Sequence, residues 1–236
     1  MRIDASVPPD TPLSKLPNFD PRTVPVVGVD SHLPLVADAA MTGDALRARF
    51  ASPPKWEPEL WAEPRFSERK TAQASVLIGI VMRERPTVVL TERTTHLSTH
   101  SGQVAFPGGK RDDTDTDAAH TALREAQEEI GLAPEFIEVI GQMPTYRTGT
   151  QFIITPVVSL VRPEHSITIN PFEVADAFEV PLDFLMNPAH HRRHFVEWNA
   201  GRREWFSMPY MDGTTERFIW GATAAMLRNF YRFLSA

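Results

Sequence analysis

Three glutamates, Glu125, Glu128 and Glu129, lie close together in an alanine-rich segment, Thr116 to Ile130, that we expect to be helical. Spacings of three and four residues place their carboxylates on one stripe of a helix. Like charges at these spacings destabilise an isolated helix, and the helix dipole disfavours anions near the C-terminal end. Because Mg²⁺ and Mn²⁺ bind oxygen ligands, the pattern favours a divalent metal site.

A solvated acidic face is the alternative, with Arg124 pairing with Glu128 one turn along the helix. On the helix alone the two interpretations weigh about equally. The neighbouring residues favour the metal site. Gly108 and Gly109 end an expected strand with a turn through which backbone can approach a ligand, and Gly131 is suited to end the helix in a left-handed conformation.

The same residues carry a resemblance to a known family. Gly109, then Asp115, then the run from Arg124 to Leu132 (REAQEEIGL) resembles the Nudix box: Gly, a distant Glu, then Arg-Glu-apolar-any-Glu-Glu-any-Gly-apolar. The C-terminal half matches fully. The N-terminal half departs from the pattern, because the distant Glu is Asp115 and one extra residue separates it from Arg124; the coenzyme A branch of the family is similar in this longer spacing.

A second motif precedes the box. The segment from Leu90 to Gly109 (LTERTTHLSTHSGQVAFPGG) resembles the signature of coenzyme A pyrophosphatases, and Glu173-Val174 with the later Val180-Pro181-Leu182 looks like the same branch. The resemblance covers roughly residues 74 to 190.

The resemblance implies a divalent-metal-dependent hydrolysis of the pyrophosphate bond of coenzyme A or its derivatives, giving 3′,5′-ADP and 4′-phosphopantetheine. It implies that Glu125, Glu128 and Glu129, beside Gly109, hold Mg²⁺ or Mn²⁺, and that Arg124 orients the carboxylates. Glu128 or Glu173 is the expected general base, because a carboxylate near metal-bound water needs little basicity. For Glu173, a plain surface position at the start of a strand is an equally weighted alternative.

Other functions stay open. A Nudix hydrolase of another nucleoside diphosphate derivative, such as ADP-ribose or NADH, is the main alternative, because the box fixes the reaction and not the attached group. A non-catalytic Nudix-fold binding module is less favoured, because Glu125, Glu128 and Glu129 are all present.

Cationic and neutral donors flank the expected metal loop and are candidates for contacts with substrate phosphates: Arg93, His100, Lys110 and Arg111. For each of them a structural role weighs more, such as pairing of Arg93 with Glu92 or Asp113. The cluster His190, His191 and His194 lacks metal-ligand spacing, and we expect it on the surface flank of a hairpin. We expect Trp198, Trp205, Phe206 and Tyr210 to pack in a core or an interface.

Short β-branched runs predict the strands that must position these residues. We expect a hairpin of strands 75–82 and 87–91, further strands at 136–140, 152–160 and 174–180, a short helix at 181–185, a hairpin over 193–209 and a last helix at 219–234. Strands with interspersed helices indicate an α/β (α+β) fold, and the resemblance specifies an α/β/α sandwich with a mixed β-sheet between helices. We expect residues 1–70 to be a proline-rich N-terminal arm with one short helix, 42–50, and residues 71–236 to be the Nudix hydrolase domain.

The composition limits the partners. A net charge of −6 over 236 residues disfavours binding of nucleic acid, so the expected partner is a small-molecule substrate reached through metal ions. The chain has no cysteine and no apolar run long enough to span a bilayer, so the expectation is a cytoplasmic protein without membrane contact. A homodimer, with the arm as a candidate interface, is compatible with the sequence.

Overall fold

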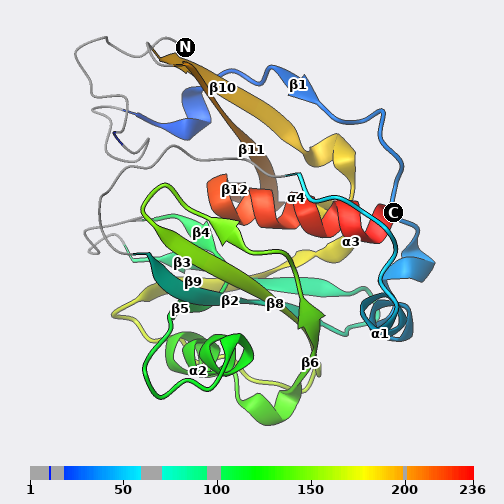
Figure 1. Ribbon diagram of the computed structural model, residues 1–236, viewed down its shortest axis with the longest axis vertical. Coiled ribbons are helices and arrows are strands. Elements are labelled where there is room, and N and C mark those ends of the chain that lie inside the picture. The colour runs from blue at the N-terminus through cyan, green and yellow to red at the C-terminus, as the bar shows by residue number, and fades with distance from the viewer. Residues whose placement is uncertain (1–10, 12–18, 60–70, 95–101, 199–200) are drawn as a thin grey trace.

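The computed structural model describes residues 11, 19–59, 71–94, 102–198 and 201–236 (Figure 1). Its central sheet contains the strands β2 (Ala72–Val81), β3 (Thr87–Arg93), β4 (Val104–Ala105), β5 (Gly108–Lys110), β6 (Ile137–Gln142), β7 (Tyr146–Arg147), β8 (Phe152–Val161) and β9 (Val174–Pro181). The main strand order is β4-β3-β2-β8-β6, while β5 pairs with β2, β7 with β8 and β9 with β3. β2 and β8 run parallel and the other pairs are antiparallel, so the sheet is mixed.

Helices cover both faces of this sheet, as Figure 1 shows for α2 (Ala118–Ile130) and α4 (Gly221–Ser235). Along β2, Leu77 and Val81 pack in one core cluster with residues of α2, whereas Ile78 and Ile80 pack in a second cluster with residues of α4. Coverage on both faces explains why the strands are continuous apolar runs. The expected sandwich with a mixed sheet between helices is confirmed.

A second, antiparallel sheet follows the order β1-β10-β11-β12 and packs on α4, with strands β1 (Gly28–Val29), β10 (Arg192–Trp198), β11 (Gly201–Asp212) and β12 (Thr215–Trp220). β10 and β11 form the hairpin expected from the sequence. The last helix starts later than expected, because Ile219 and Trp220 belong to β12. Gly221, with a φ of 62°, allows the chain to change from strand to helix within one residue.

Two of the three clustered histidines, His191 and His194, are buried, which corrects the expectation of a surface position, while His190 is partly exposed. His191 and His194 are 0% and 3% exposed. Arg228 of α4 donates to Nδ1 of His191 at 3.1 Å, so His191 is neutral and its Nε2 donates to the Leu185 carbonyl at 2.8 Å. Arg228 and Tyr231 of α4 cover His191, whereas Trp205 of β11 and the Val24 segment of the arm cover His194, and these contacts join parts of the chain that local sequence patterns do not connect. The expected packing role of Trp205 and Phe206 is confirmed by their burial.

The described part of the N-terminal arm packs on the rest of the chain. Helix α1 (Gly43–Ala51) lies within one residue of the short helix expected at 42–50, and it begins after Thr42, whose side chain accepts the Ala45 N–H at 3.3 Å. Leu46 is fully buried in the main core. Short 3₁₀ segments complete the chain at Pro21–Thr23, Asp38–Met41, Pro134–Phe136 and Pro188–His190, and α3 (Leu182–Leu185) follows β9.

A buried ion-pair network joins the arm to the C-terminal helix. Arg228 contacts Asp30 at 2.9 Å and Glu59 at 2.8 Å, and Arg193 of β10 contacts the same two carboxylates. Shared partners satisfy charges that would be costly to bury singly. The arm segments at Asp30 and Glu59 are therefore fixed on β10 and α4.

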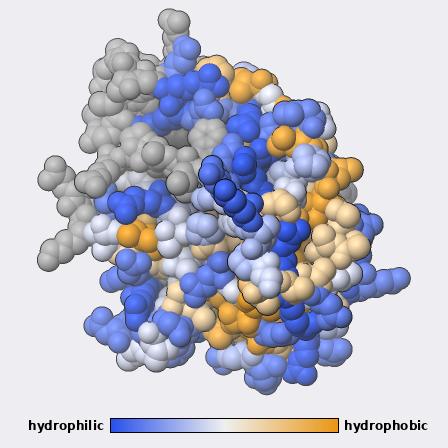
Figure 2. Space-filling view, turned by 45° about the vertical axis from the view of Figure 1, so that its right-hand side comes forward, coloured by the Kyte–Doolittle hydropathy of each residue, from blue (hydrophilic) through white to orange (hydrophobic). Residues whose placement is uncertain are grey.

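The outer surface is mixed in character. Figure 2 shows hydrophobic patches that interrupt a largely hydrophilic face. Within the described ranges, no helix combines the length and apolar character needed to cross a membrane.

Candidate functional site

Helix α2 places the glutamates against the glycine turn. The helix begins after Asp117, whose carboxylate accepts the His120 N–H at 2.8 Å, two residues later than expected. It ends at Gly131, which adopts the expected left-handed conformation with φ 65°. The stripe of Ala122, Ala126 and Ile130 is fully buried against the sheet, and this fixes the rotation of the helix about its axis.

Glu129 is a buried carboxylate at the glycine turn. It is 3% exposed, and its Oε2 accepts the Gly108 N–H at 3.0 Å. Burial raises the pKa of Glu129 to about 7, although the Gly108 N–H and the Arg93 guanidinium, 3.8 Å away, act in the opposite direction. These two contacts therefore do not offset the loss of hydration that burial imposes on the Glu129 carboxylate.

Glu125, one turn earlier, packs directly on Gly109. A Cβ atom at Gly109 would lie 2.5 Å from the carboxyl carbon of Glu125, so any other residue would displace this carboxylate from its position. Burial raises the pKa of Glu125 against the effect of Arg124, whose Nη2 lies 3.0 Å from Oε1. Glu125 and Glu129 are thus two partly compensated carboxylates on one side of the helix.

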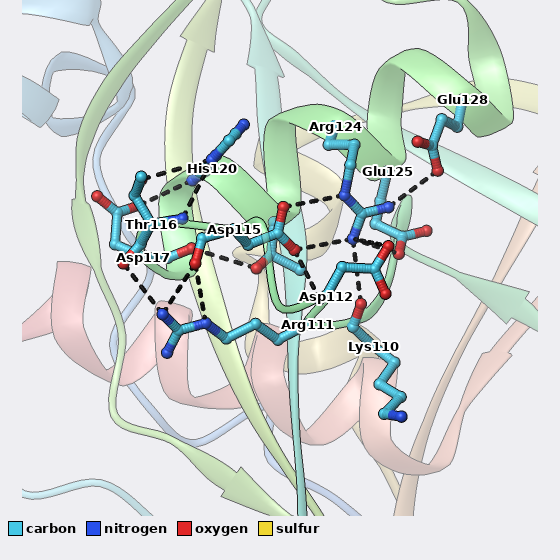
Figure 3. A network of polar contacts seen from close by, with 11 residues as sticks. Lys110, Arg111, Asp112, Asp115, Thr116, Asp117, His120, Arg124, Glu125 and Glu128 are labelled. Atoms are coloured by element: carbon cyan, nitrogen blue, oxygen red, sulfur yellow. Dashed lines mark hydrogen bonds and ion pairs between the residues drawn. The ribbon is translucent and has the colours of Figure 1, made fainter.

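Arg124 is the centre of a polar network that includes Asp115 and Glu128 (Figure 3). Its Nε and Nη2 donate to the two oxygens of Asp115 at 3.0 and 2.9 Å, and its Nη1 donates to Glu128 Oε2 at 2.9 Å. Nη2 also donates to the Lys110 carbonyl at 3.1 Å. The Arg124 guanidinium holds the pKa of the buried Asp115 carboxyl well below its usual range.

Glu128 and Glu173 have different surroundings. The Glu128 side chain is 56% exposed and is held by Arg124. Glu173 directly precedes β9, and its charge contributes to the raised pKa values of Glu125 and Glu129. Glu173 is therefore close enough to Glu125 and Glu129 for its charge to act on both carboxyl groups.

The residues expected to contact substrate phosphates have different surroundings in the structure. Arg93, at the end of β3, is close to Glu129. Arg111 donates to the carbonyls of Asp115 and Thr116 at 2.9 and 3.0 Å, so it holds the loop between β5 and α2. The Lys110 side chain extends away from this network in Figure 3. His100 lies outside the described residues.

Asn170 was not identified from the sequence. Its backbone N–H donates to the Glu129 carbonyl at 2.8 Å, and its side-chain Nδ2 donates to Glu173 Oε1 at 3.3 Å. It therefore links the end of α2 to Glu173. The Asn170-Pro171 dipeptide is a turn signal that could have indicated a structured connection here.

The carboxylates of Glu125, Glu128, Glu129 and Glu173 do not form a ready-made metal site in this structure. Over the ranges that the structure describes, no set of three or more His, Cys, Asp or Glu side chains is arranged to hold a metal ion. The close arrangement is instead that of Glu125 and Glu129 against Gly108 and Gly109.

Known proteins with similar sequences share the segment that contains these residues. A family model described as the NUDIX domain matches residues 72–208. The chain is 40% identical over 157 residues to the "Uncharacterized Nudix hydrolase NudL" of Escherichia coli K12, covering 66% of this chain and 79% of the relative. The protein of the same name from Pectobacterium atrosepticum is 39% identical over 155 residues, with the same shares covered.

Solved structures with partial similarity include a Nudix hydrolase from M. smegmatis, RenU, with a TM-score of 0.39 and 25% identity over 49% of this chain and 74% of that one. The C. elegans Ap4A hydrolase binary complex has a TM-score of 0.41 and 15% identity over 50% of this chain and 86% of that one. The family match over residues 72–208, together with the relatives that are about 40% identical, shows that the chain belongs to the Nudix hydrolase family.

Proposed function

We propose that this Nudix hydrolase cleaves the pyrophosphate bond of coenzyme A or its derivatives in a reaction that depends on Mg²⁺ or Mn²⁺, giving 3′,5′-ADP and 4′-phosphopantetheine or its acylated form. The observation that carries the proposal is the placement of the buried Glu129 and the half-buried Glu125 against the Gly108-Gly109 turn.

The donor set fits a hard divalent cation. Glu129 is buried and Glu125 is half-buried, and burial raises the pKa of both carboxyl groups, so a bound cation would stabilise their charged forms. Carboxylate oxygens are the preferred ligands of Mg²⁺ and Mn²⁺. We assign Glu125 and Glu129 as ligands, with Glu128 as a further ligand that would need to leave Arg124, and Gly109 as the residue that leaves room beside Glu125.

A divalent cation bound there would lower the pKa of a water molecule and offset the negative charge that the diphosphate brings to this acidic site. Arg124 holds Glu125 and Glu128 in fixed relative positions through its separate N–H groups. Glu173 is the stronger candidate for the general base, because its charge acts on both Glu125 and Glu129 while Glu128 is engaged by Arg124.

Cationic side chains around Glu125 and Glu129 are the proposed contacts for the substrate phosphates. Arg93 is the best placed of the described candidates, since its guanidinium already lies 3.8 Å from Glu129. Lys110 has an exposed side chain that can turn towards a bound anion. Arg111 contacts loop carbonyls and is the weaker candidate, and His100 keeps its proposed role from the sequence alone.

Support for coenzyme A comes from the signature between Leu90 and Gly109, and the box supports hydrolysis of a nucleoside diphosphate derivative in general. Purified protein should therefore be incubated separately with coenzyme A, ADP-ribose and NADH, with Mg²⁺ or with EDTA, and the products identified by mass spectrometry. The variants Glu129→Gln, Glu173→Gln and Glu128→Gln should be assayed beside the wild type, with Glu135→Gln as an exposed control.

We expect metal-dependent release of 3′,5′-ADP and 4′-phosphopantetheine, and a loss of more than about a hundredfold in Glu129→Gln, since disturbing even the outer partners of metal ligands costs 10- to 100-fold. A larger loss in Glu128→Gln than in Glu173→Gln would reverse the base assignment. Cleavage of ADP-ribose or NADH without cleavage of coenzyme A would remove the substrate proposal, and no cleavage at all would favour a binding module.

A further inference from the structure

The turn from Asn170 to Glu173 is fixed beside the carboxylate pair. Asn170 binds the Glu129 carbonyl through its N–H, and its own carbonyl accepts the Glu173 N–H at 3.1 Å. The Thr94 N–H donates to the Glu173 carbonyl at 3.1 Å from the end of β3. The turn is therefore attached to α2 on one side and to the residue after β3 on the other.

Phe172 lies within this turn and exposes its ring. It is 84% exposed, the highest value among the exposed large hydrophobic residues of the described ranges. Its backbone is nevertheless satisfied, because its N–H donates to Asn170 Oδ1 at 3.2 Å and its carbonyl accepts from Thr94 Oγ1 at 3.3 Å. Because so little of the ring is buried, it contributes little to the stability of the fold, and the fold alone does not explain a phenylalanine at this position.

Phe172 lies next to the candidate site, because it directly precedes Glu173. Its Cα is about 3.8 Å from that of Glu173, as for any consecutive pair. The charge of Glu173 acts on Glu125 and Glu129. An uncharged aromatic ring on a fixed turn next to acidic side chains is suited to the uncharged part of an anionic substrate.

We propose that Phe172 determines specificity by stacking its ring on the nucleobase of the substrate. A phenyl ring has no hydrogen-bond donor or acceptor, so it recognises a flat partner through contact area, and every nucleobase presents such a face. The pantetheine arm is a flexible amide chain and gives a poorer match. This inference rests on the proposed function, since it requires a nucleoside diphosphate derivative in the site.

The test compares the two halves of the substrate. Dissociation constants of 3′,5′-ADP and AMP, which carry the base, and of 4′-phosphopantetheine, which lacks it, are measured by calorimetry with Mg²⁺ for the full chain. The variants are Phe172→Ala, Phe172→Leu and Phe172→Trp, with Leu35→Ala as a matched control because Leu35 is 68% exposed and belongs to the arm. Thermal unfolding of each variant verifies that the fold is retained.

We expect Phe172→Ala to weaken binding of both nucleotides about tenfold, Phe172→Leu to weaken it almost as much, and Phe172→Trp to preserve it. Binding of 4′-phosphopantetheine and the Tm should stay unchanged, and Leu35→Ala should alter none of these values. In turnover of the substrate, Phe172→Ala should raise KM more than it lowers kcat.

Equal nucleotide affinity in Phe172→Ala, a loss confined to 4′-phosphopantetheine, or full retention by leucine would overturn the stacking proposal. Absence of nucleotide binding to the wild type would overturn it as well. If the wild type hydrolyses none of the tested compounds but loses nucleotide affinity in Phe172→Ala, the proposed function fails and the stacking contact stands.

Discussion

The carboxylate of Asp115 accepts two hydrogen bonds from the guanidinium of Arg124, at 3.0 and 2.9 Å. Asp115 stands where the general Nudix pattern has the distant glutamate. Its contact with Arg124 shows that Asp115 holds this arginine in place, a role that the sequence spacing did not define. The same guanidinium holds Glu125 and Glu128, so Asp115 anchors the residue that orders both.

Replacement Asp115→Asn should lower the free energy of unfolding by about 3 kcal/mol, because it leaves Arg124 without its buried counterion. The lowered pKa of Asp115 means that its stabilising effect is present above the pKa of an unfolded aspartate and is lost as the pH falls through the folded-state pKa. Urea unfolding at neutral pH measures the loss. The exposed neighbour in Asp113→Asn serves as control, and equal stability of the two variants would contradict the role of Asp115.

Divalent metal should stabilise the folded protein independently of any substrate. Saturating Mn²⁺ should raise Tm by about 5 °C, because a ligand that binds only the native state shifts the unfolding equilibrium. The shift should disappear in Glu129→Gln and persist in Glu135→Gln, as measured by calorimetry. A shift of the same size in both variants would place the bound metal elsewhere.

His191 should make stability depend on pH. Burial lowers its pKa from 6.5 to about 4, so the unfolded chain binds a proton in this interval that the folded chain does not. Stability from this residue is complete above about pH 6.5 and falls by up to about 3 kcal/mol as the pH drops to about 4.

Urea unfolding across this pH interval, for wild type and His191→Gln, isolates the contribution of His191 from that of the carboxylates. The variant should show a shallower decline on acidification, although its stability at neutral pH is lower. Identical slopes would show that His191 is not the group that titrates.

Asn170→Ala should affect the turn that carries Glu173. The variant loses the acceptor for the Phe172 N–H and the donor to Glu173, at a cost of about 1 to 2 kcal/mol in stability. We expect kcat to fall more than KM rises, since Glu173 loses a fixed position. Steady-state kinetics measure both, and Asn170→Asp, which keeps the acceptor but places a second carboxylate against Glu173, should restore neither the full stability nor kcat.

Leu46→Ala should show whether the N-terminal arm belongs to the folding unit. The division of the chain at residue 70 stays a prediction, but Leu46 is fully buried in the main core, so its truncation should cost about 2 to 5 kcal/mol. Leu35→Ala, an exposed position of the same arm, should cost little. A single unfolding transition that is unchanged in Leu46→Ala would indicate an arm that contributes nothing to the core.

The sequence by itself determined the position of the glutamate-bearing helix and of most strands, because local periodicity and turn residues encode them. Glu125 and Glu129 were placed on one helical stripe from their spacing, and Gly131 ended the helix as expected. The continuous apolar runs of β2 and β8 likewise indicated strands of a buried sheet.

Only the tertiary structure decided which of these groups meet. Glu129 faces the Gly108 N–H while Glu128 turns to Arg124, a distinction that depends on how α2 rotates against the sheet. The contact of Asn170 with Glu129 and that of His191 with Arg228 join segments far apart in the chain. Such contacts arise from packing between elements, and local sequence patterns carry no information on that packing.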